Sequence, residues 1–395
     1  MKAFLLPISF LILINYSCDN YDDISTIQSD SFIKNYTLNQ MNTGTGVCKL
    51  SDGGYALLGY TETLTRETDI CLIITDAFGN SIQQAKLYGG RKSDRGYCIK
   101  QMPDGGFAIL GSRQHEERGD LDIYLIRTDR LGDTLWTRTF GGEDSDDEGL
   151  CFDTDENGNI MMVGYTFGSE KKTWHFLVDQ NGDLIDAYIP KPYGIGSNNE
   201  ARFVKRVKDE WLITGVMYIP QLTPIWRITS DYRLLPIILD SIITDEEANA
   251  LTVLDDNNYL VCGTEPDGTG GSKVLVYRIR KTLEDEHTIR YIREKEEIYK
   301  FNPTNNNKGT SILTRNNQIH ILSTLTYNDK TSMISVITTN LQGENPEYRS
   351  FGGSSLMESR NFEFTEDEGF IISGTNKRDY KSSLVMIKTK AGGQL

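Results

Sequence analysis

The chain has 395 residues, of which 41 are basic and 56 acidic, and its formal net charge at pH 7 is −15. A negative surface of this size opposes binding to nucleic acid and to anionic lipid headgroups, so neither is an expected partner. Hydrophobic residues make up 38% of the chain and 20 residues are tyrosines, a composition that favours strands over a helical bundle.

The first 17 residues have the composition of a signal peptide. Lys2 precedes an apolar run from Ala3 to Tyr16, which is shorter than the roughly 20 residues that a membrane-spanning helix needs. The following pair, Ser17 and Cys18, resembles the lipobox of bacterial lipoproteins. That resemblance implies cleavage before Cys18 and attachment of lipid to Cys18 as the new N-terminus. Asn15 and Tyr16 depart from the lipobox pattern, so ordinary secretion without a lipid is the alternative interpretation.

Residues 18–30 are predicted to form an acidic tether. Asp19, Asp22 and Asp23 follow Cys18 closely, and a segment of this composition stays solvated instead of packing into a core. Acidic residues at this place resemble the export signal of lipoproteins in Bacteroides-type bacteria. The resemblance implies an outer-membrane protein that faces the cell exterior and contacts the membrane only through its N-terminal lipid.

From residue 31 to residue 395 the chain repeats one pattern and is predicted to form a single domain. Each copy has an aromatic or large apolar residue, three mostly apolar residues and a closing small residue, and the closing residues recur every 48 to 60 positions. A repeat of about 50 residues built from short strands is typical of a β-propeller, with one blade per repeat. Stacked blades share one continuous core, so the length of the chain does not require several domains. The copies are Tyr55–Gly59, Phe107–Gly111, Ile160–Gly164, Trp211–Gly215, Tyr259–Gly263, Ile319–Ser323 and Phe370–Gly374.

The second repeat shows how a blade is built. Four strands are predicted at residues 97–102, 107–111, 122–128 and 134–140, and Gly105 and Gly132 supply the positive φ angles of the tight turns between them. The strands are apolar at consecutive positions, which predicts that both of their faces are packed. The predicted fold class is therefore all-β, a seven-bladed β-propeller of four-stranded antiparallel blades.

The seventh repeat ends after its third strand, and Ser31–Tyr36 lies ahead of the first repeat, where a fourth strand belongs. We expect this segment to pair with the last blade and to close the ring, which removes two open sheet edges. Two other segments interrupt the pattern. The charged residues 282–299 are predicted to form a long hairpin of the fifth blade in preference to a short helix, and residues 188–198 form a longer loop.

The repeat as a whole resembles bacterial surface propellers. Asp52–Tyr55 and Asp104–Phe107 have the sequence Asp-Gly-Gly followed by an aromatic residue, with Thr-Asp pairs at Thr75 and Thr128. The chain is similar over about residues 32–392 to lipoprotein propellers that Bacteroides-type bacteria keep near their TonB-dependent nutrient importers. The resemblance implies a non-enzymatic accessory or binding component of an importer. The expected partners are an outer-membrane transporter or other surface lipoproteins, and an oligopeptide or a glycan; no cofactor is expected.

Two other functions stay open, a surface glycosidase or lyase on the same scaffold and a purely structural interaction platform. The four histidines lack metal-ligand spacing, and neither a nucleophile elbow nor a phosphate loop occurs. A glycosidase, however, needs only two facing carboxylates, and 56 acidic residues are available. Trp174 and Trp226 are candidates for stacking on sugars, with core packing the favoured interpretation.

One segment has the beginning of a calcium loop. Asp153, Asp155 and Asn157 place oxygen atoms at alternate positions ahead of Gly158. Met161 and Gly164 stand where further acidic ligands are needed. The segment is therefore interpreted as the turn between two strands, and no metal is expected.

Two further groups of residues are interpreted as structural. The run from Glu143 to Glu148 has five carboxylates in six residues and is interpreted as a solvated loop in preference to a site for a cation or a basic partner. Its counterpart Arg91–Asp94 is mixed in charge, which predicts no shared role. Cys48, Cys98 and Cys151 occupy nearly equivalent places in their repeats and are interpreted as small buried residues in preference to a metal or redox cluster.

Overall fold

The computed structural model describes residues 30–143, 145–186, 198–217, 225–229, 234–236, 246–283, 289–299, 306–327 and 330–395. These residues form strands and turns, with one short 3-10 turn, η1 (Ala391–Gly393), near the C-terminus. The all-β prediction is therefore confirmed for this part of the chain. The predicted signal peptide, the tether up to residue 29 and most of the loop predicted at residues 188–198 lie outside the described residues.

Strands that follow one another in the chain pair with one another in antiparallel sheets. Three four-stranded sheets follow one another along the chain. The first sheet contains β2 (Asn42–Lys49), β3 (Tyr55–Glu62), β4 (Thr68–Thr75) and β5 (Lys86–Tyr88); the second contains β6 (Asp94–Gln101), β7 (Phe107–Gln114), β8 (Leu121–Thr128) and β9 (Thr134–Phe140); the third contains β10 (Asp146–Thr154), β11 (Ile160–Phe167), β12 (Lys171–Val178) and β13 (Leu184–Asp186).

The next sheet has twelve strands in three runs of four, each run antiparallel. Single residue pairs join the runs, Val216 with Glu247 and Ser272 with Asn306. The hairpin predicted at residues 282–299 is confirmed, since β20 and β21 pair along their length. The runs are β14 (Asn199–Val207), β15 (Glu210–Met217), β16 (Ile225–Ile228) and β17 (Leu234–Pro236); β18 (Glu247–Val253), β19 (Asn258–Pro266), β20 (Ser272–Leu283) and β21 (Ile289–Tyr299); and β22 (Asn306–Arg315), β23 (Gln318–Thr326), β24 (Ser332–Asn340) and β25 (Glu347–Gly352).

The last sheet combines both ends of the chain. It contains β26 (Leu356–Phe364), β27 (Phe370–Arg378), β28 (Lys381–Lys388) and, at its outer edge, β1 (Phe32–Tyr36). Phe32 lies opposite Lys388 and Tyr36 opposite Leu384, in an antiparallel register without a shift. The predicted pairing of Ser31–Tyr36 with the last repeat is thus confirmed for its strand residues.

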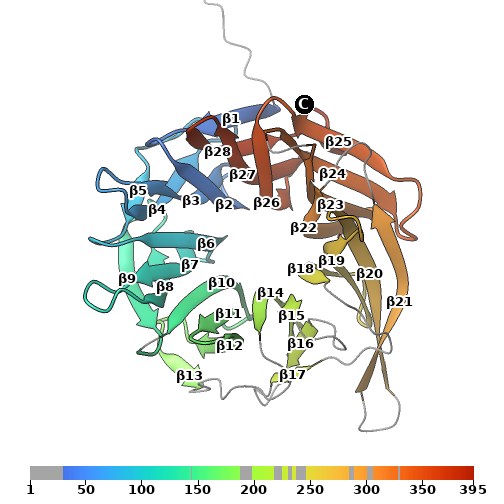
Figure 1. Cartoon of the computed structure of the whole chain (residues 1–395), viewed down its shortest axis with the longest axis horizontal. Helices are drawn as coiled ribbons and strands as arrows, with labels where there is room; N and C mark the ends of the chain where they lie inside the picture. The colour runs from blue at the N-terminus through green and yellow to red at the C-terminus, as the bar shows by residue number, and fades with distance from the viewer. Residues whose placement is uncertain are drawn as a thin grey trace, which may run out of the picture.

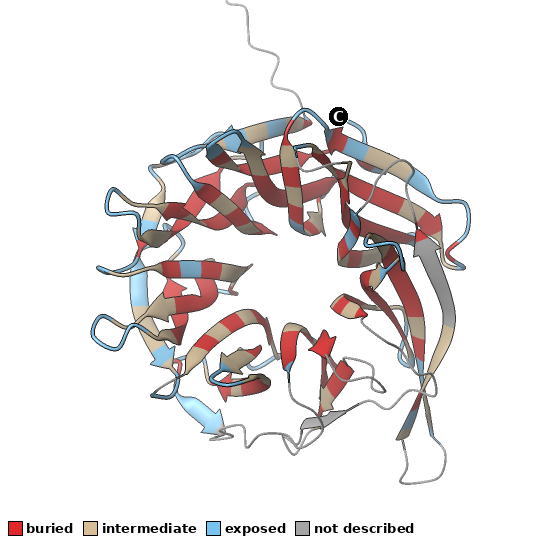
Figure 2. Ribbon diagram, in the orientation of Figure 1, coloured by how far each residue is buried: buried red, intermediate tan, exposed pale blue. Residues whose placement is uncertain are grey.

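The sheets are arranged around a common centre, and β2, β6, β10, β14, β18, β22 and β26 lie closest to it (Figure 1). We call these seven the inner strands. Buried residues fill the strands, whereas exposed residues gather on turns and on the outermost strands (Figure 2). In β7, all residues from Phe107 to Ser112 are buried, as the consecutive apolar pattern predicted.

Apolar side chains pack between each sheet or run and the next. Ile70 and Leu72 of the first sheet share one buried cluster with Phe107 and Ile109 of the second. The first and last sheets share another, in which Leu57 packs with Leu384 and Met386. Burial of apolar surface between sheets therefore continues from the last sheet to the first.

Polar contacts tie the first sheet to the last as well. The backbone N–H of Asn42 donates to Ser382 Oγ at 2.7 Å, and Asn42 Nδ2 donates to the Ser382 carbonyl oxygen at 2.7 Å. Farther along β2, the side chain of Asn361 accepts from the Val47 N–H at 2.9 Å and donates to the Val47 carbonyl oxygen at 3.0 Å. These bonds satisfy backbone groups that the sheet ladders leave free.

Each inner strand contains a β-bulge, and the closing small residue of the repeat lies directly opposite its start. In the second sheet, Gly96 pairs with Gly111, and the register shifts between Gly96 and Cys98. A Cβ atom on Gly111 would lie 1.9 Å from the carbonyl oxygen of Arg95. The same approach holds in the third sheet, where a Cβ on Gly164 would lie 1.8 Å from the carbonyl oxygen of Glu148. The small closing residue is therefore required because the bulge turns a backbone carbonyl toward it.

We predict that Gly111→Ala destabilises the fold by about 2–3 kcal/mol, because the new methyl group overlaps a backbone oxygen that cannot rotate away. Chemical denaturation of the variant and the parent protein measures this difference. Gly168→Ala is the matched control, since a Cβ there meets nothing within 4 Å, and its effect should stay within about 0.5 kcal/mol. Equal unfolding midpoints for the two variants would contradict this account of the repeat.

Candidate functional site

A continuous series of polar contacts runs across the inner strands β6, β10, β14 and β18, with one residue each from β11 and β12 linking β10 to β14. Glu148, Glu200 and Glu247 occupy the same position in three of these strands, immediately before the small residue at which the bulge begins. Equivalent positions on strands arranged around one centre lie at one level, so these carboxylates are brought together although about 50 residues separate each from the next. We call the series the polar arc; its members are Arg95, Tyr97, Glu148, Tyr165, Lys171, Glu200, Arg202, Glu247 and Asn249.

The first part of the polar arc is a carboxylate held between two tyrosines. Tyr97 donates its hydroxyl to Glu148 Oε2 at 2.7 Å, and Tyr165 donates to Glu148 Oε1 at 2.6 Å. Burial and then the Glu148 carboxylate raise the pKa of both tyrosines well above the ordinary value. Both phenols therefore stay protonated and act as hydrogen-bond donors.

The second part of the arc is an ion-paired network around Glu200, which is buried. Lys171 Nζ donates to Glu200 Oε2 and Arg202 Nε donates to Glu200 Oε1, each at 2.6 Å. Arg202 also donates to Glu247 at 2.8 Å and to Asn249 at 2.7 Å. Burial opposes ionisation of Glu200, but Arg202 and Lys171 hold the pKa of its carboxyl below the ordinary value.

A cation–π contact joins the two parts. The Lys171 ammonium lies 4.1 Å from the centroid of the Tyr165 ring. The side chains of Lys171 and Arg202 remain 33% and 27% exposed, so part of each cation faces solvent. The arc therefore offers donors, acceptors and aromatic faces to a ligand, while its buried charge is already compensated.

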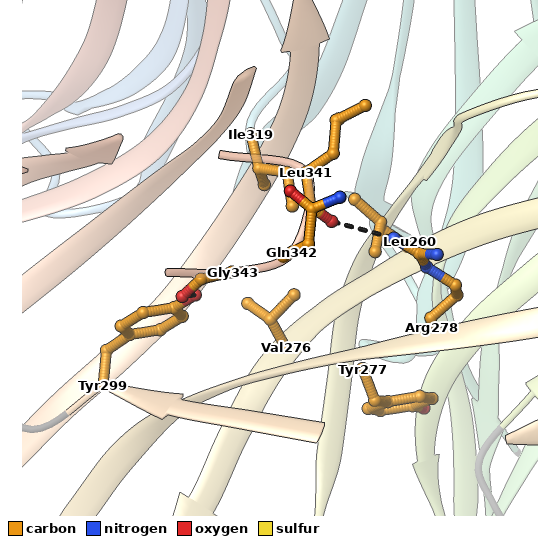
Figure 3. A pocket seen from close by; sticks show the side chains of 9 residues that line it. All are labelled: Leu260, Val276, Tyr277, Arg278, Tyr299, Ile319, Leu341, Gln342 and Gly343. Atoms are coloured by element: carbon orange, nitrogen blue, oxygen red, sulfur yellow. Dashed lines mark hydrogen bonds between the residues drawn. The ribbon is translucent and has the colours of Figure 1, made fainter. Parts of the chain in front are cut away.

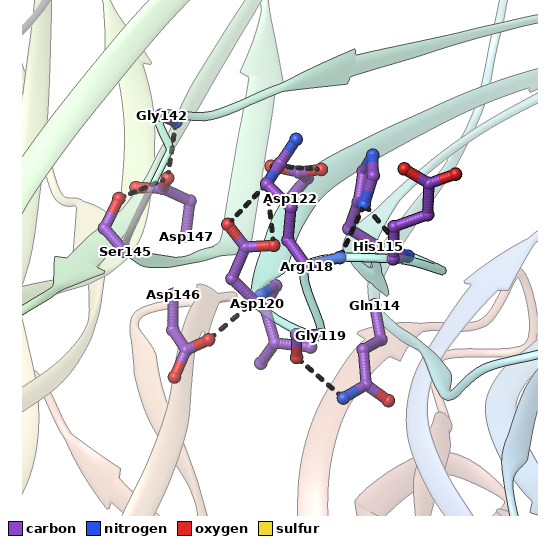
Figure 4. A network of polar contacts seen from close by, with 12 residues as sticks. Gln114, His115, Arg118, Gly119, Asp120, Asp122, Gly142, Ser145, Asp146 and Asp147 are labelled. Carbon is purple, nitrogen blue, oxygen red and sulfur yellow. Dashed lines mark hydrogen bonds and ion pairs between the residues drawn. The ribbon is translucent and has the colours of Figure 1, made fainter.

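A second polar network lies at the start of β10, next to Glu148 in the chain (Figure 4). Asp147 is buried and accepts from the Gly142 N–H at 2.9 Å and from Ser145 Oγ at 3.1 Å. Asp146 accepts from the Leu121 N–H at 2.9 Å. The interpretation of Glu143–Glu148 as a solvated loop is therefore wrong for residues 146–148, which begin a strand and carry specific contacts; Asp144 lies outside the described residues.

The prediction of no shared role for Asp94 is also wrong. Asp94 accepts from the Gly90 N–H at 2.8 Å, just as Asp147 accepts from Gly142, so the two aspartates fix equivalent junctions between sheets. Burial raises the pKa of Asp94 to about 6. The overall charge of the two segments does not reveal this, because the contact depends on one aspartate, Asp94 in the first segment and Asp147 in the second.

The candidate calcium ligands have other roles. Asp155 accepts from the N–H groups of Asn157 and Asn159, each at 2.9 Å, and thereby forms the turn between β10 and β11. Asp153 is buried, pairs with Lys100 and accepts from the Arg206 N–H at 2.8 Å. Over the described ranges, no group of three or more His, Cys, Asp or Glu residues is arranged to hold a metal ion.

The other candidate residues are placed as follows. Trp174 and Trp226 are 1% and 5% exposed and belong to the core, which confirms the favoured interpretation. Cys98 and Cys151 occupy the same position of their strands, but in β2 the residue at that position is Gly46. Cys48 lies two residues farther along and pairs with Ala56, so the predicted equivalence holds only for Cys98 and Cys151. Cys18 lies outside the described residues.

Two cavities between sheets are small. Leu341, Gln342 and Gly343 from the turn after β24 face Val276 and Tyr299 across a space of about 20 Å³ (Figure 3). A larger cavity of about 150 Å³ lies between β23 and β27, where His320 packs its ring against Phe364 and Phe370. Pockets for drug-sized ligands usually measure about 300–1,000 Å³, so neither cavity suits a ligand of that size. An open groove of about 550 Å³ beside β1 and β5 lies on the outer side of the molecule.

Within the described residues, no helix has the length and apolar character that crossing a membrane requires. No protein-family model matches the chain, and no curated protein matches it.

Solved structures do resemble it. The ulvan lyase of polysaccharide lyase family 25 has a TM-score of 0.53 and 9% identity, covering 93% of this chain and 96% of that one. YCF48 from Cyanidioschyzon merolae has a TM-score of 0.51 and 10% identity, covering 90% and 98%. The extracellular domain of the hybrid two-component system BT4673 from B. thetaiotaomicron has a TM-score of 0.50 and 14% identity, covering 90% of this chain and 39% of that one. At these identities the likeness shows the fold alone, that of β-propeller proteins.

Proposed function

We propose that this protein is a non-enzymatic cell-surface lipoprotein whose propeller binds a polar oligomer, an oligopeptide or a glycan, as an accessory component of an outer-membrane nutrient importer. The polar arc is the observation that carries the binding role. Its cations, carboxylates and tyrosines form one connected network over four inner strands and the adjoining β11 and β12, which suits an extended ligand better than a small one. Sugars and peptides are recognised by such mixtures of hydrogen-bonding groups and aromatic faces.

The protonation states of the tyrosines and of Glu200 in the polar arc favour binding over catalysis. A lyase or glycosidase needs a base that is free to accept a proton, or an acid with a pKa near the working pH. The pKa of Tyr97 and that of Tyr165 are shifted away from that range, and Glu200 is held ionised between two cations. A surface lyase is the second candidate, because a propeller of similar fold is a polysaccharide lyase.

Binding is tested by titrating glycan and peptide libraries into the chain without its signal peptide. We expect Arg202→Gln to weaken the binding of the best ligand at least about 10-fold, since a lost charged hydrogen bond costs about 1.5–3 kcal/mol. Arg349→Gln is the control, because Arg349 also lies beside a carboxylate but is on the outer strand β25, and it should leave affinity unchanged. Cleaved sugars or peptides in the reaction mixture would establish the enzyme instead. Equal effects of both variants would exclude the arc as the site.

The anchor rests on Cys18 and on the organisation proposed for the N-terminus, a signal peptide over residues 1–17 and a tether over residues 18–30. In a Bacteroides-type host, the parent protein should fractionate with the outer membrane, be digested by protease added to whole cells and co-purify with an integral transporter. Cys18→Ser should move it to the soluble fraction. Unchanged membrane recovery of the variant would refute lipid anchoring, and protection from protease would place the protein on the inner side.

We further propose that each four-strand unit is one blade, so that residues 31–395 form a single seven-bladed ring latched by β1. Pairing of β1 with β28 and packing of the first sheet on the last support this arrangement. Deletion of residues 19–36 should lower the melting temperature by about 5 °C or more, because it exposes the edge of β28 and removes Phe32 and Tyr36 from a core cluster. Deletion of residues 19–29 alone is the control and should have no effect. Identical melting of the two deletions would refute the latch.

A further inference from the structure

Two cysteines meet where neighbouring sheets approach each other at the centre. Cys98 on β6 and Cys151 on β10 each follow the bulge of their inner strand, opposite Leu110 and Val163. Their Sγ atoms are 3.8 Å apart, and both thiols lie within 4 Å of the carbonyl oxygen of Phe152. The equivalent positions of the bulges bring these residues together across 53 positions of sequence.

The two thiols differ in exposure and acidity. Cys151 is buried, whereas Cys98 is partly exposed. The hydrogen bond with Cys151 lowers the pKa of Cys98, although burial opposes this, and the nearby Lys100 ammonium acts in the same direction as the hydrogen bond. The same contact and burial raise the pKa of Cys151. Cys98 is the more exposed of the two thiols and therefore the one that meets a reagent from solvent first, with Cys151 behind it.

We propose that Cys98 and Cys151 are a modification site at which a small-molecule disulfide, such as oxidised glutathione, converts the two thiols into a disulfide between the second and third sheets. The Cys98 thiolate attacks one sulfur of the small disulfide, whose S–S bond breaks and releases one small thiol after protonation. Cys151 then loses its proton and attacks Cys98 Sγ, which releases the second small thiol. The protein loses two electrons and two protons, and the small disulfide gains them.

The geometry permits the bond with little movement. A disulfide requires the sulfur atoms to close from 3.8 Å to about 2.05 Å, a change within the reach of side-chain rotation combined with a small shift of two bulged strands. The bond would join β6 and β10 beside Tyr97 and Glu148, and so fix the spacing of the first part of the polar arc. The other described cysteines, Cys48, Cys71 and Cys262, are buried without a thiol contact and are not expected to react.

The test uses the chain without its signal peptide and with Cys18→Ser, incubated with oxidised glutathione, alkylated under denaturing conditions and analysed by mass spectrometry. We expect loss of two alkylation sites, a cross-link between the peptides that contain Cys98 and Cys151, and a rise in melting temperature of about 5 °C that dithiothreitol reverses.

Single variants separate this site from general oxidation. Cys151→Ser should stop at one glutathione bound to Cys98, Cys98→Ser should remain unmodified, and Cys48→Ser should form the cross-link like the parent. Full alkylation of both thiols in the oxidised parent, or a cross-link that involves Cys48, would overturn the proposal. The parent peptide map decides the question even where a variant does not fold.

Discussion

The structure depends on the bulge of each inner strand and the space that it needs in the neighbouring strand. The bulge turns a backbone carbonyl oxygen toward the adjacent strand, and only a residue without a large side chain accepts that oxygen; Gly111 faces Arg95 O and Gly164 faces Glu148 O in this way. The repeated bulges set equivalent residues of successive inner strands at one level. Both the polar arc and the pair of thiols are products of that alignment, since their members are distant in sequence but equivalent in position.

Packing follows from the same arrangement. A sheet with neighbouring sheets on both sides has no solvent-exposed face, so its middle strands bury consecutive residues. The backbone N–H and C=O groups of these strands are hydrogen-bonded to the adjacent strands. Polar groups at strand ends form hydrogen bonds where one sheet meets the next, as Asp147 does with Gly142 and Asn42 with Ser382. Where the described part of the chain buries a charged side chain, a partner accompanies it, as Lys100 accompanies Asp153.

The sequence was informative wherever a local rule acts. Gly132 and Gly105 predicted turns, and the consecutive apolar residues of Phe107–Leu110 predicted a strand buried on both faces. The lack of a fourth strand in the seventh repeat predicted that Ser31–Tyr36 pairs with the last repeat. The site was not predictable in this way. Glu148, Glu200 and Arg202 look like ordinary surface charges one at a time, and their contacts depend on the position of each bulge, which no local pattern reveals. The same cause misplaced Cys48, because counting residues back from the closing glycine is unreliable across an irregular strand.

The seam between the first and last sheets differs from every other junction in its folding cost. Neighbouring sheets elsewhere join segments about 50 residues apart, whereas Asn42 meets Ser382 across 340 residues. The loop-closure entropy of the longer separation exceeds that of the shorter by about 2 kcal/mol. The seam can form only after nearly the whole domain has been synthesised. The two hydrogen bonds between Asn42 and Ser382, and the two between Asn361 and Val47, give this late contact a defined register.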